Sequence, residues 1–353
     1  MIKQNVRRNI LLVVTLFLFC NSRANPTNNR YEYVEFATNV STFEIWSDDE
    51  ILLGDNSGHL VLFNMTNGKQ TSLYSKEIQV TSITKIPGKE RAIVTFADGT
   101  VVLFNCNHSS LSYEKILNSE ESILNNYSMV NSINISSDGK KALFCRDLFF
   151  EKRGLVEVWD LEEERIIFKF CTDFLPGAIV FSSDNSWVIA GDSDGIITWY
   201  RLSDGYAAYS INSGLMHITN IYTQDLHLFV VTSDATFSSV DPSKSYSLFK
   251  KTRIGLDQVD TIIPLQVDGQ ENFIGSCSKN MVFLLNKMSQ FIIKCPTLRA
   301  IKKIKILQQR KPIVLLEDGT LIGYLFDFLL QEKKQELDKE QDTFTQRFSE
   351  FCL

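Results

Sequence analysis

The sequence predicts an all-β protein, a seven-bladed β-propeller of four-stranded antiparallel blades. Three observations predict this fold class. The 353-residue chain is rich in short alternating strands joined by tight turns, these turns return about every forty residues, and one further strand stands alone before the first repeat. A period of about forty residues with four strands in each repeat is typical of β-propellers.

The repeat is clearest at residues 191–205, which read Gly-Asp-Ser-Asp-Gly-Ile-Ile-Thr-Trp-Tyr-Arg-Leu-Ser-Asp-Gly. The pair Asp194-Gly195 is suited to the positive φ of a hairpin turn. The residues from Ile196 to Arg201 then alternate between the two faces of a strand. A second turn at Asp204-Gly205 ends that strand, so this stretch predicts one antiparallel hairpin inside a blade.

Equivalent turns place seven repeats along the chain. Neighbouring turns are 39 to 45 residues apart, except for one interval of 55 residues whose excess falls in two loops. The residue that marks the turn between the second and third strand of each repeat is, in order, Gly58, Gly99, Gly154, Gly195, Ala235, Asn280 and Gly319.

The strand Tyr31–Phe36 has no partner in its own neighbourhood, and the seventh repeat lacks a convincing fourth strand. We therefore expect Tyr31–Phe36 to pair with the strand Thr320–Phe326. A last blade that takes its outer strand from the opposite end of the chain closes the ring through a hydrogen-bonded ladder. This gives a propeller domain over residues 25–330.

Residues 1–24 have the three parts of a secretory signal peptide. Lys3, Arg7 and Arg8 precede an uncharged apolar run over residues 10–20, and Ser22 and Ala24 are small residues suited to cleavage. An apolar run of about eleven residues is too short to cross a bilayer unaided, where about twenty are needed. The alternatives are an uncleaved membrane anchor and a buried N-terminal segment.

Residues 331–353 are predicted to form a C-terminal amphipathic helical tail. Leu330, Leu337, Phe344, Phe348 and Phe351 lie near heptad spacing among charged and amide residues. Such a helix either binds a partner or packs against the side of the ring.

Charge argues against nucleic acid as a partner. The formal net charge of the whole chain is −6, and loss of the four cations in residues 1–24 would make it about −10, whereas nucleic-acid binding relies on a cationic surface. Two local basic clusters remain, and each is either a patch for an anion or acidic partner or a charged strand edge that resists aggregation. They comprise Lys294, Arg299, Lys302, Lys303, Lys305, Arg310 and Lys311 in one cluster, and Lys244, Lys250, Lys251 and Arg253 in the other.

Seven cysteines and several glycosylation motifs bear on the compartment. Cys145 and Cys171 are expected on the second and fourth strands of one blade, as are Cys277 and Cys295, too far apart to bridge within a blade. Disulfides would then join blades, loops or the tail, and buried thiols are the alternative. Sequons give mild support to a secreted glycoprotein, and they occur at Asn39, Asn64, Asn107, Asn126 and Asn134.

The sequence Leu155-Val-Glu-Val-Trp159-Asp160 resembles the strand ending of the WD40 repeat family, and Asp98-Gly-Thr and Asp318-Gly-Thr resemble its turns. The resemblance covers roughly residues 31–330 and implies the propeller architecture, but it indicates little about function. The family's Gly-His pair before each first strand is missing, so its buried His-Ser-Trp-Asp hydrogen-bond network is not expected. Residues 58–69 are also similar to the repeats of quinone-dependent propeller dehydrogenases, but those carry a Trp late in each repeat that is lacking here.

The sequence offers no convergent catalytic or metal-binding group. The four histidines, His59, His108, His217 and His227, are far apart, so no zinc spacing arises. The carboxylates of residues 48–50 and 192–194 could hold a hard cation, but Asp is also the usual cap of a tight turn. We expect no cofactor, no metal and no enzymatic activity.

The candidate partner-binding residues lie in the longest loop inside a repeat, Arg146-Asp-Leu-Phe-Phe-Glu-Lys-Arg-Gly154. Exposed aromatics beside cations often dominate binding energy, although the two phenylalanines could instead tuck against the blade. The residues chosen are Arg146, Phe149, Phe150, Lys152 and Arg153. We expect a monomeric, non-catalytic scaffold of the secretory pathway that binds a protein or peptide on one rim and meets a membrane only if residues 1–24 stay uncleaved. A secreted quinone- or metal-dependent enzyme and an intracellular WD40 scaffold are the alternatives.

Overall fold

The computed structural model describes residues 33–37, 39–107, 110–117, 130–148, 153–215, 217–224, 227–234, 236–240, 250–253, 259, 261–267, 270–277, 281–286, 291–297, 299–307 and 311–324. Within these ranges the secondary structure consists of strands, and all pairings between strands are antiparallel. The all-β prediction and the four-stranded antiparallel sheets are therefore confirmed.

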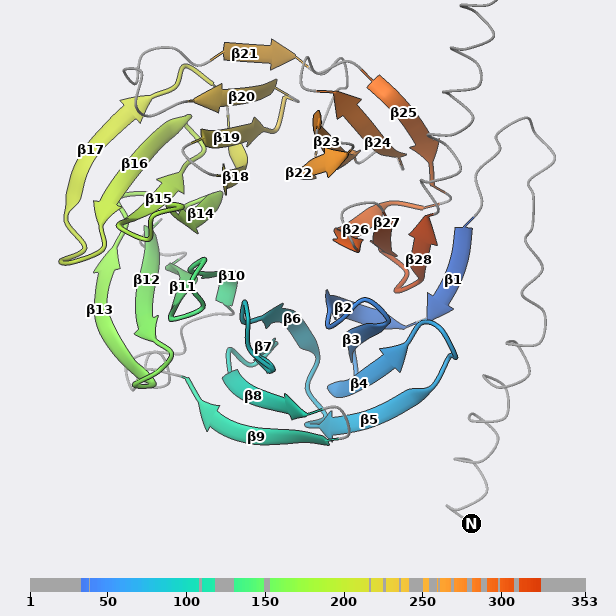
Figure 1. Ribbon diagram of the computed structural model, residues 1–353. Helices are drawn as coiled ribbons and strands as arrows, with labels where there is room; N and C mark the ends of the chain where they lie inside the picture. Colours follow the sequence, from blue (N-terminus) through green and yellow to red (C-terminus); the bar gives the residue numbers. More distant parts are fainter. Residues whose placement is uncertain are drawn as a thin grey trace, which may run out of the picture.

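The described strands form seven four-stranded sheets, which we number in chain order. The sheets surround a common centre, and the strands of each one are named from the innermost outward (Figure 1). Sheet 1 is β2 (Val40–Ile45), β3 (Glu50–Asp55), β4 (His59–Asn64) and β5 (Gln70–Ser75); sheet 2 is β6 (Val80–Lys85), β7 (Arg91–Phe96), β8 (Val101–Asn107) and β9 (Ser110–Ile116); sheet 3 is β10 (Val130–Ile135), β11 (Lys141–Leu148), β12 (Arg153–Asp160) and β13 (Arg165–Cys171); sheet 4 is β14 (Ala178–Phe181), β15 (Trp187–Gly191), β16 (Ile196–Arg201) and β17 (Ala207–Asn212).

The second half of the chain continues the pattern. Sheet 5 is β18 (Ile218–Gln224), β19 (His227–Thr232), β20 (Thr236–Val240) and β21 (Lys250–Arg253); sheet 6 is β22 (Thr261–Val267), β23 (Gln270–Cys277), β24 (Met281–Asn286) and β25 (Phe291–Pro296); sheet 7 is β26 (Ile301–Leu307), β27 (Lys311–Leu316), β28 (Leu321–Tyr324) and β1 (Tyr33–Ala37). Sheet 7 thus combines strands from both ends of the propeller domain.

The tight turns between the second and third strands pack closely against the chain segment next to the following sheet. Gly195 has φ of 77°, and a Cβ atom there would lie 2.1 Å from the carbonyl oxygen of Leu215 in the loop that leads to sheet 5. Gly319 has φ of 81° and lies against Asn39 and Val40, just before sheet 1. A side chain at either position would both strain the backbone and separate the two segments. We call the side of the ring that carries these turns the turn face.

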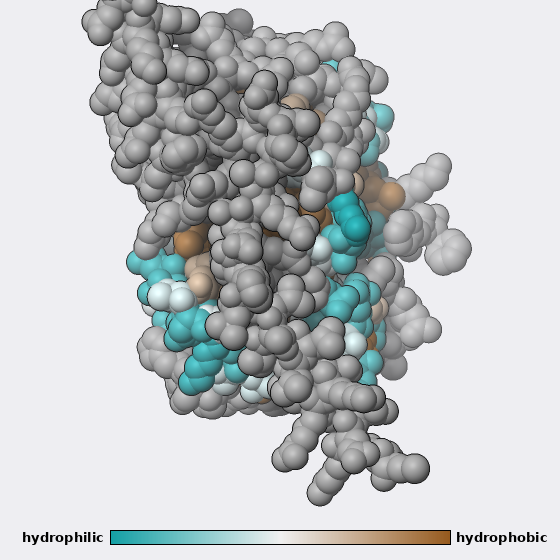
Figure 2. Space-filling model, turned by 90° about the vertical axis from the view of Figure 1, so that its right-hand side faces the viewer, coloured by the Kyte–Doolittle hydropathy of each residue, from teal (hydrophilic) through white to brown (hydrophobic). Residues whose placement is uncertain are grey.

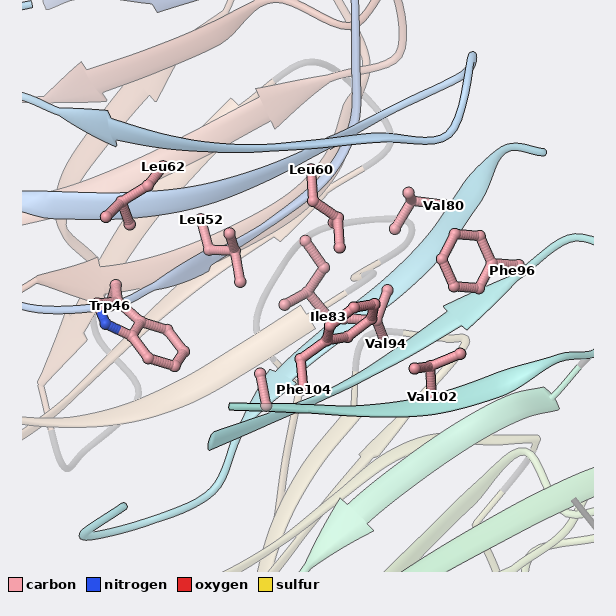
Figure 3. Packing of buried hydrophobic residues seen from close by; sticks show 11 residues of the cluster. Trp46, Leu52, Leu60, Leu62, Val80, Ile83, Val94, Phe96, Val102 and Phe104 are labelled. Carbon is pink, nitrogen blue, oxygen red and sulfur yellow. The ribbon is translucent and has the colours of Figure 1, made fainter. Parts of the chain in front are cut away.

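Sheet packing buries one hydrophobic cluster between each pair of neighbouring sheets. Figure 3 shows the cluster between sheets 1 and 2, where Leu52 and Leu60 of sheet 1 meet Val80 and Phe96 of sheet 2. The other six clusters join sheets 2 and 3, 3 and 4, 4 and 5, 5 and 6, 6 and 7, and 7 and 1. Because both faces of a sheet are covered in this way, each strand can carry apolar residues on either side.

The predicted partnership between the ends of the domain is present. Strand β1 pairs with β28, with Tyr33 opposite Tyr324, Val34 opposite Gly323 and Glu35 opposite Ile322. The cluster between sheets 7 and 1 includes Leu321 and Phe43, so packing reinforces the ladder. Figure 2 shows this side of the molecule, where the coloured surface between grey regions is largely hydrophilic with small hydrophobic areas.

Both terminal predictions fall outside the described residues. The signal peptide at residues 1–24 and the helical tail at residues 331–353 are therefore still predictions. In the part of the chain that the structure describes, no helix is long and apolar enough to span a membrane.

Removing β1 should weaken the whole ring. A chain that starts at residue 38 loses the ladder to β28, and each net hydrogen bond contributes about 0.5 to 1.5 kcal/mol. We expect the free energy of unfolding in urea to fall by several kcal/mol. A chain that starts at residue 32 keeps β1 and is the control. Equal unfolding midpoints for the two chains would show that this ladder contributes nothing to stability.

Candidate interaction site

The loop predicted to bind a partner lies at the end of the longest hairpin that the structure describes. Strands β11 and β12 each contain eight residues, and their pairing runs from Lys141 opposite Asp160 to Leu148 opposite Arg153. Arg153 is exposed at this end. Phe149, Phe150 and Lys152 lie outside the described residues, so their predicted role is still a prediction. The hairpin ends on the turn face.

The prediction that Arg146 binds a partner is wrong, because its side chain is not available to a partner. Its side chain is 1% exposed, and its Nε lies 3.5 Å from Oε2 of Glu157, whose side chain is fully buried. Its Nη1 donates a hydrogen bond of 3.2 Å to the carbonyl oxygen of Gly99. Burial lowers the pKa of the guanidinium, while the carboxylate of Glu157 opposes that change.

This buried pair fixes the hairpin to the neighbouring sheet. Arg146 and Glu157 lie on β11 and β12, whereas Gly99 belongs to the turn that precedes β8 of sheet 2. Nε and Nη2 of Arg146 are buried without a hydrogen-bond acceptor of good geometry among the described residues. A buried pair of this kind stabilises little by itself, but it holds the loop end of the hairpin in one place.

Sequence reasoning missed Glu157, although a signal was present. Glu157 sits between valines in Leu155-Val-Glu-Val-Trp159, and it is directly opposite Phe144. On a strand buried on both faces, a carboxylate at such a position needs a cationic partner. Arg146 is that partner, although its place beside the aromatic loop residues suggested an exposed side chain.

The innermost strands form a second candidate site, which we call the inner wall. Each innermost strand has a partner strand on only one edge, and side chains of neighbouring sheets bond to its backbone. Lys303 Nζ donates to the carbonyl oxygen of Phe43 at 2.8 Å, and Lys85 Nζ donates to that of Trp46 at 2.5 Å. The same arrangement joins Ser41 to Val80, Asn134 to Phe181, and Thr223 to Phe181.

Three consecutive sheets carry all the charged residues of the innermost strands. Strands β10, β14, β18 and β22 contain none in their sequence. Strands β26, β2 and β6 contain four lysines and one carboxylate, and these are Lys302, Lys303, Lys305, Lys85 and Glu44. We call this part of the inner wall the basic sector; it is positive although the protein as a whole is negative.

This position corrects one interpretation of the basic cluster around residue 300. Lys302, Lys303 and Lys305 were candidates for a charged strand edge that resists aggregation, yet β26 is the innermost strand of sheet 7. Another chain cannot add a strand there without entering the ring. The interpretation does fit Lys250 and Lys251, because β21 is the outermost strand of sheet 5.

The side chain of Lys303 contacts sheet 1 and has a lowered pKa. Its Nζ also donates to the hydroxyl of Thr42 at 3.2 Å and lies 5.5 Å from the centre of the Phe43 ring. Burial lowers its pKa to about 8, and the nearby ammonium groups of Lys305 and Lys302 lower it further, whereas Glu44 opposes the change. Glu44 itself binds Lys305, with 3.1 Å between Oε2 and Nζ.

The carboxylates considered as cation ligands act in turns. Asp192 accepts hydrogen bonds from the backbone N–H groups of Asp194 and Ile196 at 2.9 and 2.7 Å. Asp49 accepts one from the hydroxyl of Thr66. Among the described residues, no group of three or more His, Cys, Asp or Glu is placed to hold a metal ion.

The Trp-Asp pair of sheet 3 serves the local fold. Asp160 accepts hydrogen bonds of 2.9 Å from the N–H groups of Glu162 and Glu163, chiefly the latter, and these lower the pKa of its carboxyl. The indole nitrogen of Trp159 is buried with no hydrogen-bond acceptor in the described part of the chain. Cys145 lies on β11 and Cys171 on β13, separated by β12, and they are not bridged to each other. Burial raises the pKa of the Cys145 thiol to about 12.

Comparisons with known proteins identify the fold alone. No protein-family model matches this chain, and no curated protein matches it. A solved chain described as "Crystal Structure of Mitotic Checkpoint Complex" superposes with a TM-score of 0.65 and 10% identity, covering 85% of this chain and 94% of that one. As many as 1740 solved chains match, so the architecture is widespread and does not by itself specify a function. The likeness supports a β-propeller fold.

The buried pair in the hairpin allows a double-mutant test. Replacing Arg146 with Met or Glu157 with Leu leaves an uncompensated buried charge, which typically costs about 3 to 5 kcal/mol. Replacing both removes both charges, so we expect the double variant to unfold at a urea concentration closer to that of the wild type than either single variant does. Additive losses would show that the two charges do not act as a pair.

Lys303 should make stability depend on pH in an alkaline window. Its pKa is about 8 in the folded chain against 10.5 for an ordinary lysine, so the unfolded state binds more protons between these values. The contribution of Lys303 to the free energy of unfolding therefore rises as the pH increases from about 8 to about 10.5, by about 1 to 3 kcal/mol. Urea unfolding of the wild type and Lys303→Met at pH 7.5 and 10 measures it. Parallel pH profiles would contradict the assignment.

Proposed function

We propose that the protein is a non-catalytic scaffold for protein–protein interaction, built as one closed seven-bladed β-propeller of the WD40-like kind. The packing between sheets 7 and 1 and the β1–β28 ladder support closure. The likeness to a chain from a structure of a protein complex is compatible with a scaffold role. On this proposal the chain is a monomer that binds a protein or peptide on one rim.

The anchored β11–β12 hairpin carries the proposal. An interaction loop is most effective when its base is rigid, because less conformational entropy is lost on binding. Arg146 supplies that rigidity through its contacts with Glu157 and Gly99, which join sheets 3 and 2. The hairpin ends on the turn face with Arg153 exposed, and the sequence that joins its two strands is Phe149-Phe150-Glu151-Lys152. Aromatic residues beside cations are typical of residues that dominate interface energies.

The N-terminal sequence supports entry into the secretory pathway, with cleavage near Ala24. The carboxylate-rich mature chain, with a net charge of about −10, and the sequons are compatible with a lumenal or extracellular protein. Two sequons are already engaged, because the side-chain oxygen of Asn134 accepts a hydrogen bond from the backbone of Phe181, and that of Asn64 accepts hydrogen bonds from the N–H groups of Thr66 and Asn67. We therefore place glycans at the other sequons, beginning with the exposed Asn39.

Capture experiments test the hairpin as the partner-binding site. We expect tagged wild-type protein, expressed in its native cell, to retain specific proteins that mass spectrometry identifies. A Phe149→Ala, Phe150→Ala, Arg153→Ala variant should lose at least one of them because it lacks the aromatic and cationic contacts. Lys69→Ala, in an exposed turn on the opposite face, is the matched control.

Two outcomes of the same experiment count against the proposal. Retention of every captured protein by the hairpin variant removes the hairpin from the binding site. Sequencing the N-terminus of the captured bait tests the signal peptide, since a mature start near Asn25 requires export, whereas a start at Met1 contradicts cleavage near Ala24.

A further inference from the structure

A repeated irregularity in the innermost strands distinguishes Lys302 from its counterparts. In five of the seven sheets, the register between the first and second strands shifts after the first residue. Each shift leaves one extra residue in a β-bulge, a feature that redirects a side chain. The extra residues are Ser41, Thr81, Asn131, Thr219 and Lys302.

Four of these residues are small and polar, and each bonds to the second strand of its own sheet. The hydroxyl of Ser41 donates to the carbonyl oxygen of Gly54, and that of Thr219 donates to the carbonyl oxygen of Val231. The hydroxyl of Thr81 lies 2.8 Å from that of Thr95. Asn131 donates to the carboxylate of Asp147. The repeat therefore uses this position to bond to polar groups of the second strand, and Ser41 also reaches the carbonyl oxygen of Val80 in the neighbouring sheet.

Lys302 breaks this rule. Its side chain is exposed, and it makes no hydrogen bond or ion pair with any residue in the described ranges. A lysine is too long and too charged to replace the short side chain that bonds to the second strand elsewhere. Lys302 therefore places an exposed side chain at the bulge near the start of β26.

The surrounding charges leave this part of the wall positive. Two carboxylates are already paired with cations on or next to β26, since Glu44 binds Lys305 and Asp318 binds Arg299. Glu317 is exposed at the turn that follows β27. Burial is the main cause of the lowered pKa of Lys303, and the nearby ammonium groups of Lys305 and Lys302 lower it further. Like charges held together on one strand favour a bound anion.

We propose that the basic sector binds an oxyanion group, a carboxylate or a phosphate, with Lys302 as its main contact and Lys303 as a second donor. Lys303 uses two N–H groups for Thr42 and Phe43 and has one more to donate. Charge-assisted hydrogen bonds from two ammonium groups are suited to a carboxylate or phosphate oxygen. The ligand is either a free phosphate compound or an acidic side chain of a peptide that enters the ring from the turn face.

Calorimetric titration at low ionic strength tests the site with two probes, inorganic pyrophosphate and a hexaglutamate peptide. We expect at least one probe to bind the full chain with a dissociation constant below about 1 mM. The variant Lys302→Thr, which restores the residue type of Thr81 and Thr219, should weaken that binding about tenfold or more. Lys69→Thr removes the same charge from an exposed turn on the opposite face and should bind as the wild type does.

The two probes separate the sources of the oxyanion. Binding of pyrophosphate alone indicates a phosphate compound, binding of the peptide alone indicates an acidic segment, and binding of both indicates a site that recognises the shared charge. No binding of either probe up to about 10 mM, or equal binding by Lys302→Thr, overturns the proposal. If Lys302→Thr fails to fold by circular dichroism, Lys302→Gln takes its place.

Discussion

Every sheet of this protein depends on two neighbours, and that mutual dependence is the constraint on which the structure rests. A four-stranded sheet with apolar residues on both faces cannot be stable alone in water. The seven interfaces each contain a buried cluster, including the one between the first and last sheets of the chain. Sheet 7 takes its outermost strand from the other end of the domain, so the β1–β28 ladder joins the two ends of the chain in one sheet.

Local sequence predicted the sheets well because turns and alternation are local properties. Asp-Gly pairs fix the hairpins, and Asp192 and Asp160 cap turns in the way that short carboxylate side chains favour. The lone strand was placed correctly because an incomplete repeat at one end implied a missing strand at the other. Predicted strand Tyr31–Phe36 and observed β1 at Tyr33–Ala37 differ by one or two residues at each end, which is the usual uncertainty of strand boundaries.

The candidate site was predicted less well because its chemistry depends on contacts between repeats. Arg146 looked like part of an exposed loop, but Glu157 and Gly99 enclose it. The lysines after residue 300 looked like a protected outer edge, although β26 is innermost. Arg146 and the lysines after residue 300 all looked like exposed cations in the sequence. Only the positions of their strands relative to the neighbouring sheets show which cations are buried and which are exposed. An alignment of the repeats would have identified Lys302 as an exception, since its counterparts are Ser, Thr and Asn.

The two proposed contact sites, Lys302 and the β11–β12 hairpin, lie on the same face of the ring, so the two faces of the molecule differ in their proposed roles. Lys302 follows Ile301, which pairs with Leu316 beside the turn at Asp318-Gly319. The β11–β12 hairpin ends on the same face, because Val130 at the start of β10 pairs with Arg146 just before it. Sheets 3 and 7 are not neighbours, so a ligand that contacts both must cross the mouth of the ring. If both proposals hold, one partner that contacts both sites would carry an acidic segment for Lys302 and a separate surface for the hairpin.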